Sequence, residues 1–159
     1  MAAVVRVAKL SVSVPATTTA YTGMDAITQL IESYLCRSAK PVPQALAVDG
    51  LRRALPCVVE AVRNGSSRPA REAMSHAALL SGIALANSGL GLAHGVAAAL
   101  GSVCRVPHGL ACAVMLPIAL EVNREVCLPQ LAQLARDTLG LPSMNDTEAA
   151  DRFIAHMHA

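Results

Sequence analysis

The sequence is poor in aromatic and charged side chains. Its 159 residues include two Tyr, one Phe and no Trp, and only 15% are charged, although 53% are hydrophobic. A chain of this length folds around one core, which must here be built from Ala, Leu, Val, Ile and Met. Strands favour aromatic and β-branched residues, whereas Ala, Leu and Met favour helices. The composition therefore predicts an all-α fold, a helical bundle.

The sequence also lacks the marks of several protein classes. Basic residues are scattered among acidic ones, with a net charge of +2, so no basic stripe is available for nucleic-acid phosphates. We expect no nucleic-acid partner. The five cysteines are odd in number and form no CxxC pair, which favours buried, reduced thiols and a cytoplasmic location. The start, MAAVVRVAKLSVSV, is too mixed for a secretory signal.

One stretch, residues 73–104, carries no Asp, Glu, Lys or Arg and is long enough to span a bilayer. Asn87, Ser88, Gly89, Gly91 and two histidines interrupt it, and such polar positions are costly in a membrane. We therefore expect two buried helices separated by a turn, and no membrane partner.

Apolar periodicity divides the chain into residues 1–14, expected to be an extended segment that Pro15 ends, and a helical domain over residues 15–159. Helical spacing predicts helices near 20–36, 45–58 with a break at Pro56, 67–87, 92–103, 109–121, 128–140 and 147–158. Ser67 and Asn145 are expected to cap two of them. The helices at 92–103 and 109–121 are nearly all apolar and are expected at the centre of the domain.

Three titratable residues lie in apolar surroundings near turns or helix ends: Asp25, His94 and His108. One carboxylate and two imidazoles suit a divalent transition metal. Simpler interpretations also fit, because Asp25 favours a helix N-terminus and the histidines, including His76, suit hydrogen-bonded core positions. The residues alone therefore predict no more than a candidate metal site within helices. His156 and His158 are expected on the surface.

Two long motifs resemble the catalytic domain of iron-containing (group III) alcohol dehydrogenases. TAYTGMDAITQLIESYL is similar to the family's TGxDAxxH segment, and ANSGLGLAHGVAAALGSVCRVPHGLACAVMLP is similar to GLGxxHxxxHxLG…PHGxxxAxxLP. The resemblance covers about residues 15–125. It implies the helical catalytic domain of the dehydroquinate synthase-like fold, without the family's N-terminal nucleotide-binding domain and its last helices. Exposed apolar surface is then expected.

The resemblance places the family's metal ligands on Asp25, His94 and His108. Where the family has a His one turn after the Asp, this chain has Gln29, whose amide oxygen is a weaker ligand. A further active-site His of the family is replaced by Ala98. The resemblance therefore implies a weakened site for Fe²⁺ or Zn²⁺, in which a water can fill the gap.

The resemblance also implies hydride transfer between a small alcohol or aldehyde and NAD or NADP in a homodimer, with the metal polarising the substrate oxygen. GLGLAHG connects helices rather than a strand and a helix, so it does not fit a dinucleotide-binding turn, and we expect the chain to be inactive alone. Two alternatives stay open: a non-catalytic helical module that binds a metal or a partner, and a metal-independent reductase of the maleylacetate reductase type.

Overall fold

The computed structural model describes residues 9–158, which contain helices but no strands. A short 3-10 helix, η1 (Ser11–Ser13), precedes eight α-helices. They are α2 (Ala16–Leu35), α3 (Pro41–Ala54), α4 (Val58–Arg63), α5 (Arg68–Ala86), α6 (Leu92–Cys104), α7 (His108–Asn123), α8 (Leu128–Leu139) and α9 (Asp146–His158). The all-α prediction is confirmed.

The extended segment expected at the N-terminus is wrong where the structure describes it. Residues 9–13 are helical, and the turn closes with a hydrogen bond from the Val14 N–H to the Ser11 carbonyl, 3.1 Å long. A strand needs a partner for its backbone groups, and none of the described residues forms one. Residues 1–8 of the expected segment lie outside the described residues.

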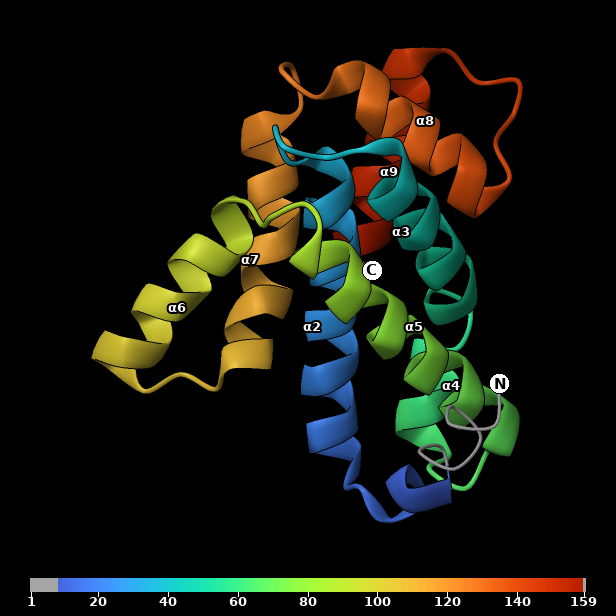
Figure 1. Cartoon of the computed structure of the whole chain (residues 1–159), viewed down its shortest axis with the longest axis vertical. Coiled ribbons are helices and arrows are strands. Elements are labelled where there is room, and N and C mark those ends of the chain that lie inside the picture. Colours follow the sequence, from blue (N-terminus) through green and yellow to red (C-terminus); the bar gives the residue numbers. More distant parts are fainter. Residues whose placement is uncertain (1–8, 159) are drawn as a thin grey trace.

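Helix α2 runs through the middle of the molecule and is surrounded by α3, α5 and α7 (Figure 1). Its side chains at Ile27, Leu30 and Ile31 are fully buried, because their spacing of three and four residues puts them on one face of the helix. At Gly50 of α3, a Cβ atom would lie 2.8 Å from Leu30 Cδ1. The absence of a side chain there lets α3 pack closely on α2.

The helix boundaries expected from turn and capping residues are largely present. The chain breaks between α3 and α4 around Pro56, since α3 ends at Ala54 and α4 begins at Val58. Asn145 caps α9 by accepting the Glu148 N–H through its side-chain oxygen at 2.9 Å. Ser67 occupies the N-cap of α5, but its side chain makes no capping hydrogen bond.

Six helices share one hydrophobic core. It combines small alanines with a few large side chains. Among the large ones, Leu51, Leu116, Leu134 and Phe153 are completely buried. Phe153 is the largest fully buried side chain of the described residues. Close helix packing around alanine thus replaces the aromatic bulk that the sequence lacks.

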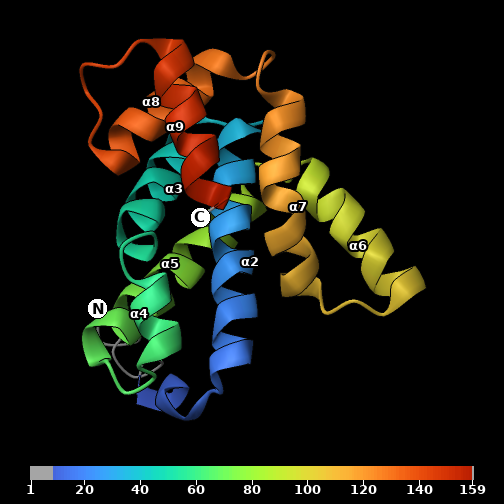
Figure 2. The ribbon, with the colours of Figure 1, turned by 180° about the vertical axis from the view of Figure 1, so that it is seen from behind.

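Helix α6 is not at the centre of the domain, which corrects the expectation for residues 92–103. It slants away from the bundle beside α7 in both views (Figures 1 and 2), and Val103 is 82% exposed. Among its residues only Ala93, His94 and Ala97 are buried. The buried apolar residues of α6 are alanines, whereas its larger side chains at Leu92 and Val103 are exposed. The expectation of two buried helices over residues 73–104 therefore fails for α6.

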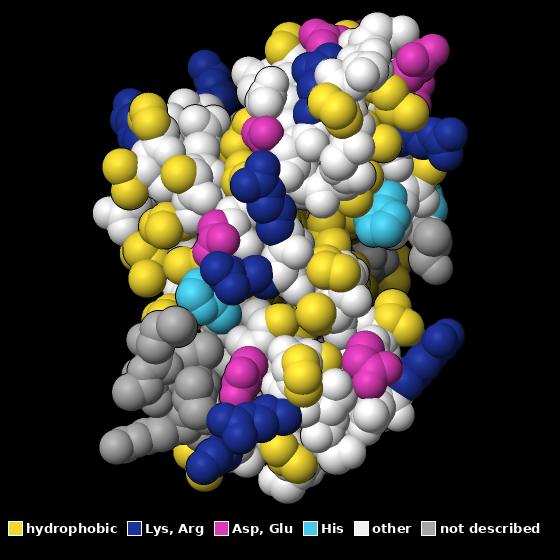
Figure 3. Space-filling model, turned by 90° about the vertical axis from the view of Figure 1, so that its right-hand side faces the viewer, with side chains coloured by type: hydrophobic (Ala, Val, Ile, Leu, Met, Phe, Trp, Pro, Cys, Tyr) yellow, Lys and Arg dark blue, Asp and Glu magenta, His cyan; other side chains and the backbone are white. Residues whose placement is uncertain are grey.

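The surface carries the exposed apolar side chains expected from the sequence. Half of the large ones among the described residues lie on α6, α7 and the turn after α7: Leu92, Val103, Val114, Ile118, Val122 and Val126. On the face shown in Figure 3, basic and acidic side chains are interspersed among apolar ones. Within residues 9–158, no helix combines the length and the apolar character that crossing a membrane requires.

The five cysteines are all free, but burial of the thiols was predicted too broadly. Cys112 is buried, Cys104 is exposed and the other three are partly buried. The exposed position of Cys104 follows from the outlying position of α6.

Candidate metal centre

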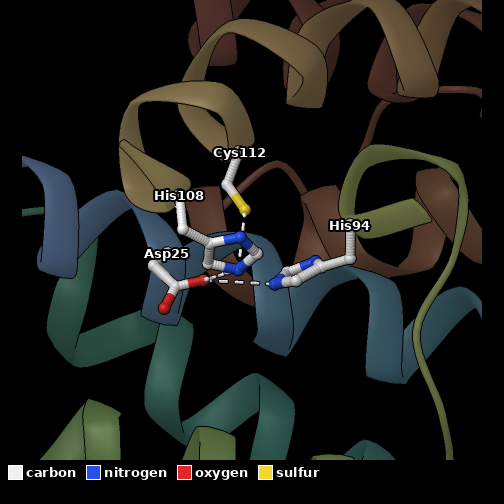
Figure 4. Close-up of side chains that lie close together, drawn as sticks. All are labelled: Asp25, His94, His108 and Cys112. Carbon is white, nitrogen blue, oxygen red and sulfur yellow. Dashed lines mark hydrogen bonds and ion pairs between the residues drawn. The ribbon is translucent and has the colours of Figure 1, made fainter. Parts of the chain in front are cut away.

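The three titratable residues singled out from the sequence converge in space. Asp25 lies in the middle of α2, His94 in the first turn of α6 and His108 at the first position of α7 (Figure 4). His94 Nε2 lies 3.1 Å from Asp25 Oδ1, and His108 Nε2 lies 3.7 Å from the same oxygen. The two imidazole rings are 5.5 Å apart between their centroids. Three helices therefore direct polar atoms at one point.

A glycine allows His108 to come this close to α2. A Cβ atom on Gly109 would collide with the carbonyl oxygen of Tyr21, one turn before Asp25. The start of α7 therefore rests directly on the backbone of α2. Because His108 precedes this contact by one residue, the close packing of the two helices sets the position of its ring.

Glu32 holds the start of α6 against α2. Its carboxylate is buried and accepts the N–H groups of Ala93 at 2.7 Å and of His94 at 3.3 Å. The first N–H groups of a helix lack partners within the helix, and a negative charge there is favoured by the helix dipole. Gly91 precedes α6 and offers no side chain, and a Cβ atom there would lie 2.8 Å from Glu32 Oε1. Glu32 thus caps α6 from another helix.

The same carboxylate orients the His94 ring. Glu32 Oε2 lies 2.7 Å from His94 Nδ1, so Nδ1 faces Glu32 and Nε2 faces Asp25. Metal-binding histidines typically direct their second ring nitrogen at a carboxylate or carbonyl oxygen, which fixes the tautomer and the ring orientation. The Glu32–His94 pair has this geometry.

The close contacts shift the pKa values of His94, Asp25 and Glu32. Burial lowers the pKa of His94, but hydrogen bonds with Asp25 and Glu32 outweigh burial and raise this pKa to about 9. Burial raises the pKa values of the Asp25 and Glu32 carboxyl groups. Hydrogen bonds, above all those from His94, and nearby positive charge outweigh burial and lower both pKa values. Two carboxylates, those of Asp25 and Glu32, therefore lie beside His94, and negative charge at this point favours a cation.

Gln29 approaches the cluster through its amide nitrogen. Its Nε2 donates to Asp25 Oδ2 at 3.3 Å, and its Oε1 accepts the Ser81 hydroxyl at 2.9 Å. The reverse orientation of the amide would set two acceptor oxygens against each other at Asp25. The oxygen that the sequence suggested as a weak ligand is therefore directed at Ser81 of α5.

Two residues of the site were missed by sequence reasoning. Glu32 follows Asp25 by seven positions, which places both on one face of α2. Cys112 follows His108 by four, and its Sγ lies 3.6 Å from His108 Nε2. Burial and the nearby Asp25 carboxylate raise the pKa of the Cys112 thiol to about 12. Helical spacing from a recognised residue was the available signal in both cases.

The donor atoms of Asp25, His94, His108 and Cys112 all lie within 4.8 Å of one another. A carboxylate, two imidazoles and a thiol are the donors that Zn²⁺ and other divalent transition metals take in proteins. The chemistry of this set therefore fits a metal ion.

Other titratable side chains stay apart from the cluster. His158 pairs with Glu121 at 2.8 Å and is 48% exposed, as expected for a surface residue. His76 lies 3.5 Å from Asp49. A mostly apolar pocket of about 460 Å³ lies between the ends of α2 and α7 and touches Glu32, but Asp25, His94 and His108 do not line it.

The fold and the cluster together define a class: an all-helical domain with potential metal ligands where α2, α6 and α7 meet. A family model described as "Fe-containing alcohol dehydrogenase family, C-terminal" matches residues 19–159. The chain belongs to the iron-containing alcohol dehydrogenase family of oxidoreductases.

Individual relatives agree with this assignment. The chain is 39% identical to the 1,3-propanediol dehydrogenase of Citrobacter freundii over 149 residues, which are 91% of this chain and 38% of the relative. It is 34% identical to the NAD-dependent methanol dehydrogenase of Bacillus methanolicus over 148 residues, 92% of this chain and 39% of the relative. A crystal structure of a 1,3-propanediol oxidoreductase matches with a TM-score of 0.91 and 36% identity, covering 95% of this chain and 40% of that one. The chain thus spans about two fifths of the length of these relatives.

Proposed function

We propose that this chain is the metal-binding, catalytic portion of an NAD(P)-dependent alcohol dehydrogenase, which transfers hydride between a small alcohol or aldehyde and a nicotinamide. The proposal rests on one observation above all: Asp25, His94 and His108 come from three helices and converge within hydrogen-bonding and ion-pair distance. In this proposal they hold Fe²⁺ or Zn²⁺. Such a metal supplies Lewis acidity, which polarises the oxygen of the alcohol or carbonyl group.

The exposure of the three side chains indicates how a substrate would approach. The His94 side chain is 7% exposed, that of Asp25 26% and that of His108 50%. The cluster is therefore closed on the Glu32 side and open beside His108. A small alcohol would reach the cluster from the His108 side, while Glu32 keeps the His94 ring in place.

The named relatives support the substrate class. One is a 1,3-propanediol dehydrogenase and another an NAD-dependent methanol dehydrogenase, so short alcohols are the substrates to test first. NAD and NADP should both be tested as cofactors. The homodimer and the cytoplasmic location expected from the sequence stay predictions.

Metal binding provides the direct test of the site. The chain is exposed to Fe²⁺ or Zn²⁺, desalted and submitted to elemental analysis. We expect His94→Ala to lose the bound metal, whereas His76→Ala, a histidine on α5 outside the cluster, should retain it. Gln29→His should raise the occupancy, because it adds an imidazole, a good metal ligand, next to Asp25. Metal retained by His94→Ala would place the ligands elsewhere.

Activity requires a separate test. The chain is combined with the nucleotide-binding domain of a similar relative, as a fused or separate polypeptide, and alcohol-dependent reduction of NAD or NADP is followed by absorbance. We expect reduction by the combination and its loss in Asp25→Asn. A combination that folds, binds metal and yet reduces no cofactor would favour the non-catalytic binding module.

One observation favours a metal-independent reductase as the second candidate. Both ring nitrogens of His94 already face carboxylates, so the cluster is neutralised in part without a cation. The two candidates differ in the effect of a chelator on the combined enzyme. Activity that persists after metal removal, verified by elemental analysis, would support the second.

A further inference from the structure

The proposed metal site lacks a fourth ligand at the position where the resemblance suggested one. The Gln29 amide nitrogen, which cannot bind a cation, faces Asp25, and its oxygen accepts the Ser81 hydroxyl. Asp25 presents two oxygens with different neighbours: Gln29 contacts Oδ2, whereas both histidines contact Oδ1. Gln29 therefore orients the carboxylate from outside the cluster and leaves Oδ1 free for a metal.

A thiol lies where the fourth ligand is needed. Cys112 is on α7, one turn after His108, and its side chain points into the cluster beside the His108 ring (Figure 4). It is fully buried, so its position is fixed by packing with Ala97 and Ala111. The other four cysteines contribute no atom to this group.

We propose that Cys112, and not Gln29, is the fourth protein ligand of the metal, which makes this a site of one carboxylate, two imidazoles and one thiolate. This inference rests on the proposed function, because it assumes that Asp25, His94 and His108 bind a metal. On binding, the thiol releases its proton to solvent and the sulfur donates an electron pair to the cation.

The distances fit four ligands around one ion. Metal–nitrogen and metal–oxygen bonds of about 2.0–2.1 Å and a Zn–S bond of about 2.3 Å put neighbouring donors of a tetrahedron roughly 3.3–3.7 Å apart. The observed separations are 3.1 Å for Asp25 to His94, 3.7 Å for Asp25 to His108 and 3.6 Å for Cys112 to His108. The widest pair of donor atoms, within 4.8 Å, needs to close by about an ångström, a change that side-chain rotation can supply.

A thiolate changes which metal the site prefers. Sulfur is a softer donor than an amide or carboxylate oxygen, and Zn²⁺ accepts thiolate together with imidazole and carboxylate. The site should therefore favour Zn²⁺ over Fe²⁺ more strongly than a site of one carboxylate and three imidazoles does.

Cobalt provides a probe that reports on sulfur directly. The full chain, reduced and metal-free, is titrated with Co²⁺, and the near-ultraviolet spectrum is searched for the intense sulfur-to-cobalt charge-transfer band. We expect this band in the wild type, with Cys112→Ser losing it and about 100-fold in Co²⁺ affinity. Cys104→Ser, which changes an exposed cysteine of α6, is the matched control and should keep both. Gln29→Ala should keep the band.

The outcomes separate this inference from the proposed function. If Co²⁺ binds and His94→Ala abolishes the binding, but no charge-transfer band appears, the metal site stands and Cys112 is not a ligand. If the band persists in Cys112→Ser, another thiol produces it and the inference is wrong. If no Co²⁺ binds at all, the proposed metal site itself fails. X-ray absorption of the Zn²⁺-loaded wild type tests the same point without a variant: one sulfur neighbour at about 2.3 Å is expected, and a shell of nitrogen and oxygen alone would overturn the inference.

Discussion

Helices α6 and α9 are both 13 residues long, but they are attached to the molecule in different ways. Helix α6 contains no Asp, Glu, Lys or Arg, whereas α9 contains four such residues. The more polar helix is nevertheless the better buried one, because Phe153 and Ile154 enter the core. Helix α6 buries only two alanines and His94. The size and spacing of a few side chains, and not apolar content, decide which helix joins the core.

Helix α6 packs on α7 through Ala97 and Leu100 and is held on α2 by polar contacts that belong to the candidate site. Glu32 accepts the N–H groups of Ala93 and His94, and the His94 ring bridges Glu32 and Asp25. The same bonds that prepare His94 to bind a metal thus attach α6 to α2. Stability and metal binding should therefore be coupled in α6 and separable in α9.

The largest expected effect comes from the core. Phe153→Ala removes the largest fully buried side chain and should lower the free energy of unfolding by about 3–5 kcal/mol through lost burial and the cavity left behind. Chemical denaturation followed by circular dichroism measures the change. Val103→Ala, on the exposed face of α6, is the control and should change stability by less than about 0.5 kcal/mol. Similar losses from both variants would contradict the contrast between the two helices.

The next effect is confined to α6. Glu32→Ala removes the acceptor for two helix N–H groups and for the His94 ring, which should cost about 2–3 kcal/mol. Hydrogen exchange should show faster exchange in α6 while α2, α8 and α9 keep their protection. Glu121→Ala removes an exposed carboxylate paired with His158 and should cost less than about 1 kcal/mol. Unchanged exchange in α6 would mean that Glu32 does not anchor it.

The pH dependence of the metal-free chain should reveal the His94 ion pairs. The pKa of His94 is raised to about 9 in the folded chain, above the usual value of about 6.5. The folded state therefore binds the proton more tightly, and this stabilisation is complete below about pH 6.5 and is lost as the pH rises through 9. Thermal unfolding with a chelator present should show a declining melting temperature over this range. His94→Gln should flatten the decline, and an equally steep decline in that variant would contradict the assignment.

The smallest effects concern two glycines. Gly109→Ala forces a Cβ atom against the Tyr21 carbonyl and should cost about 1–3 kcal/mol while displacing His108 and weakening metal binding about tenfold. Gly95 of α6 has nothing within 4 Å of its Cβ position, so Gly95→Ala should stabilise the helix by roughly 0.5–1 kcal/mol. Denaturation and Co²⁺ titration measure both variants. A neutral Gly109→Ala would show that α7 can shift without loss.

The local features of the fold could be predicted from the sequence. The break at Pro56 and the cap at Asn145 depend on neighbouring residues, and the structure contains both. The extended segment at the N-terminus was wrong for residues 9–13, because weak apolar alternation does not specify a partner strand. The position of α6 was also wrong, since helix periodicity does not say whether small side chains can anchor a helix.

The part of the candidate site that lies in the two sequence motifs could be predicted from the sequence. The motifs contain Asp25, His94 and His108, which the structure brings together. The orientation of the Gln29 amide depends on Ser81, which is 52 residues away, and the role of Glu32 depends on where α6 begins. Such contacts follow from how α2, α5 and α6 cross, which the sequence pattern alone does not reveal.

The most direct test of the account is a crystal of the full chain grown with Zn²⁺, with anomalous diffraction recorded on both sides of the zinc absorption edge. We predict one strong anomalous peak within about 2.0–2.3 Å of His94 Nε2, His108 Nε2 and an oxygen of Asp25. A zinc ion bound elsewhere, with no peak between these three side chains, would contradict the claim that α2, α6 and α7 together form a metal site.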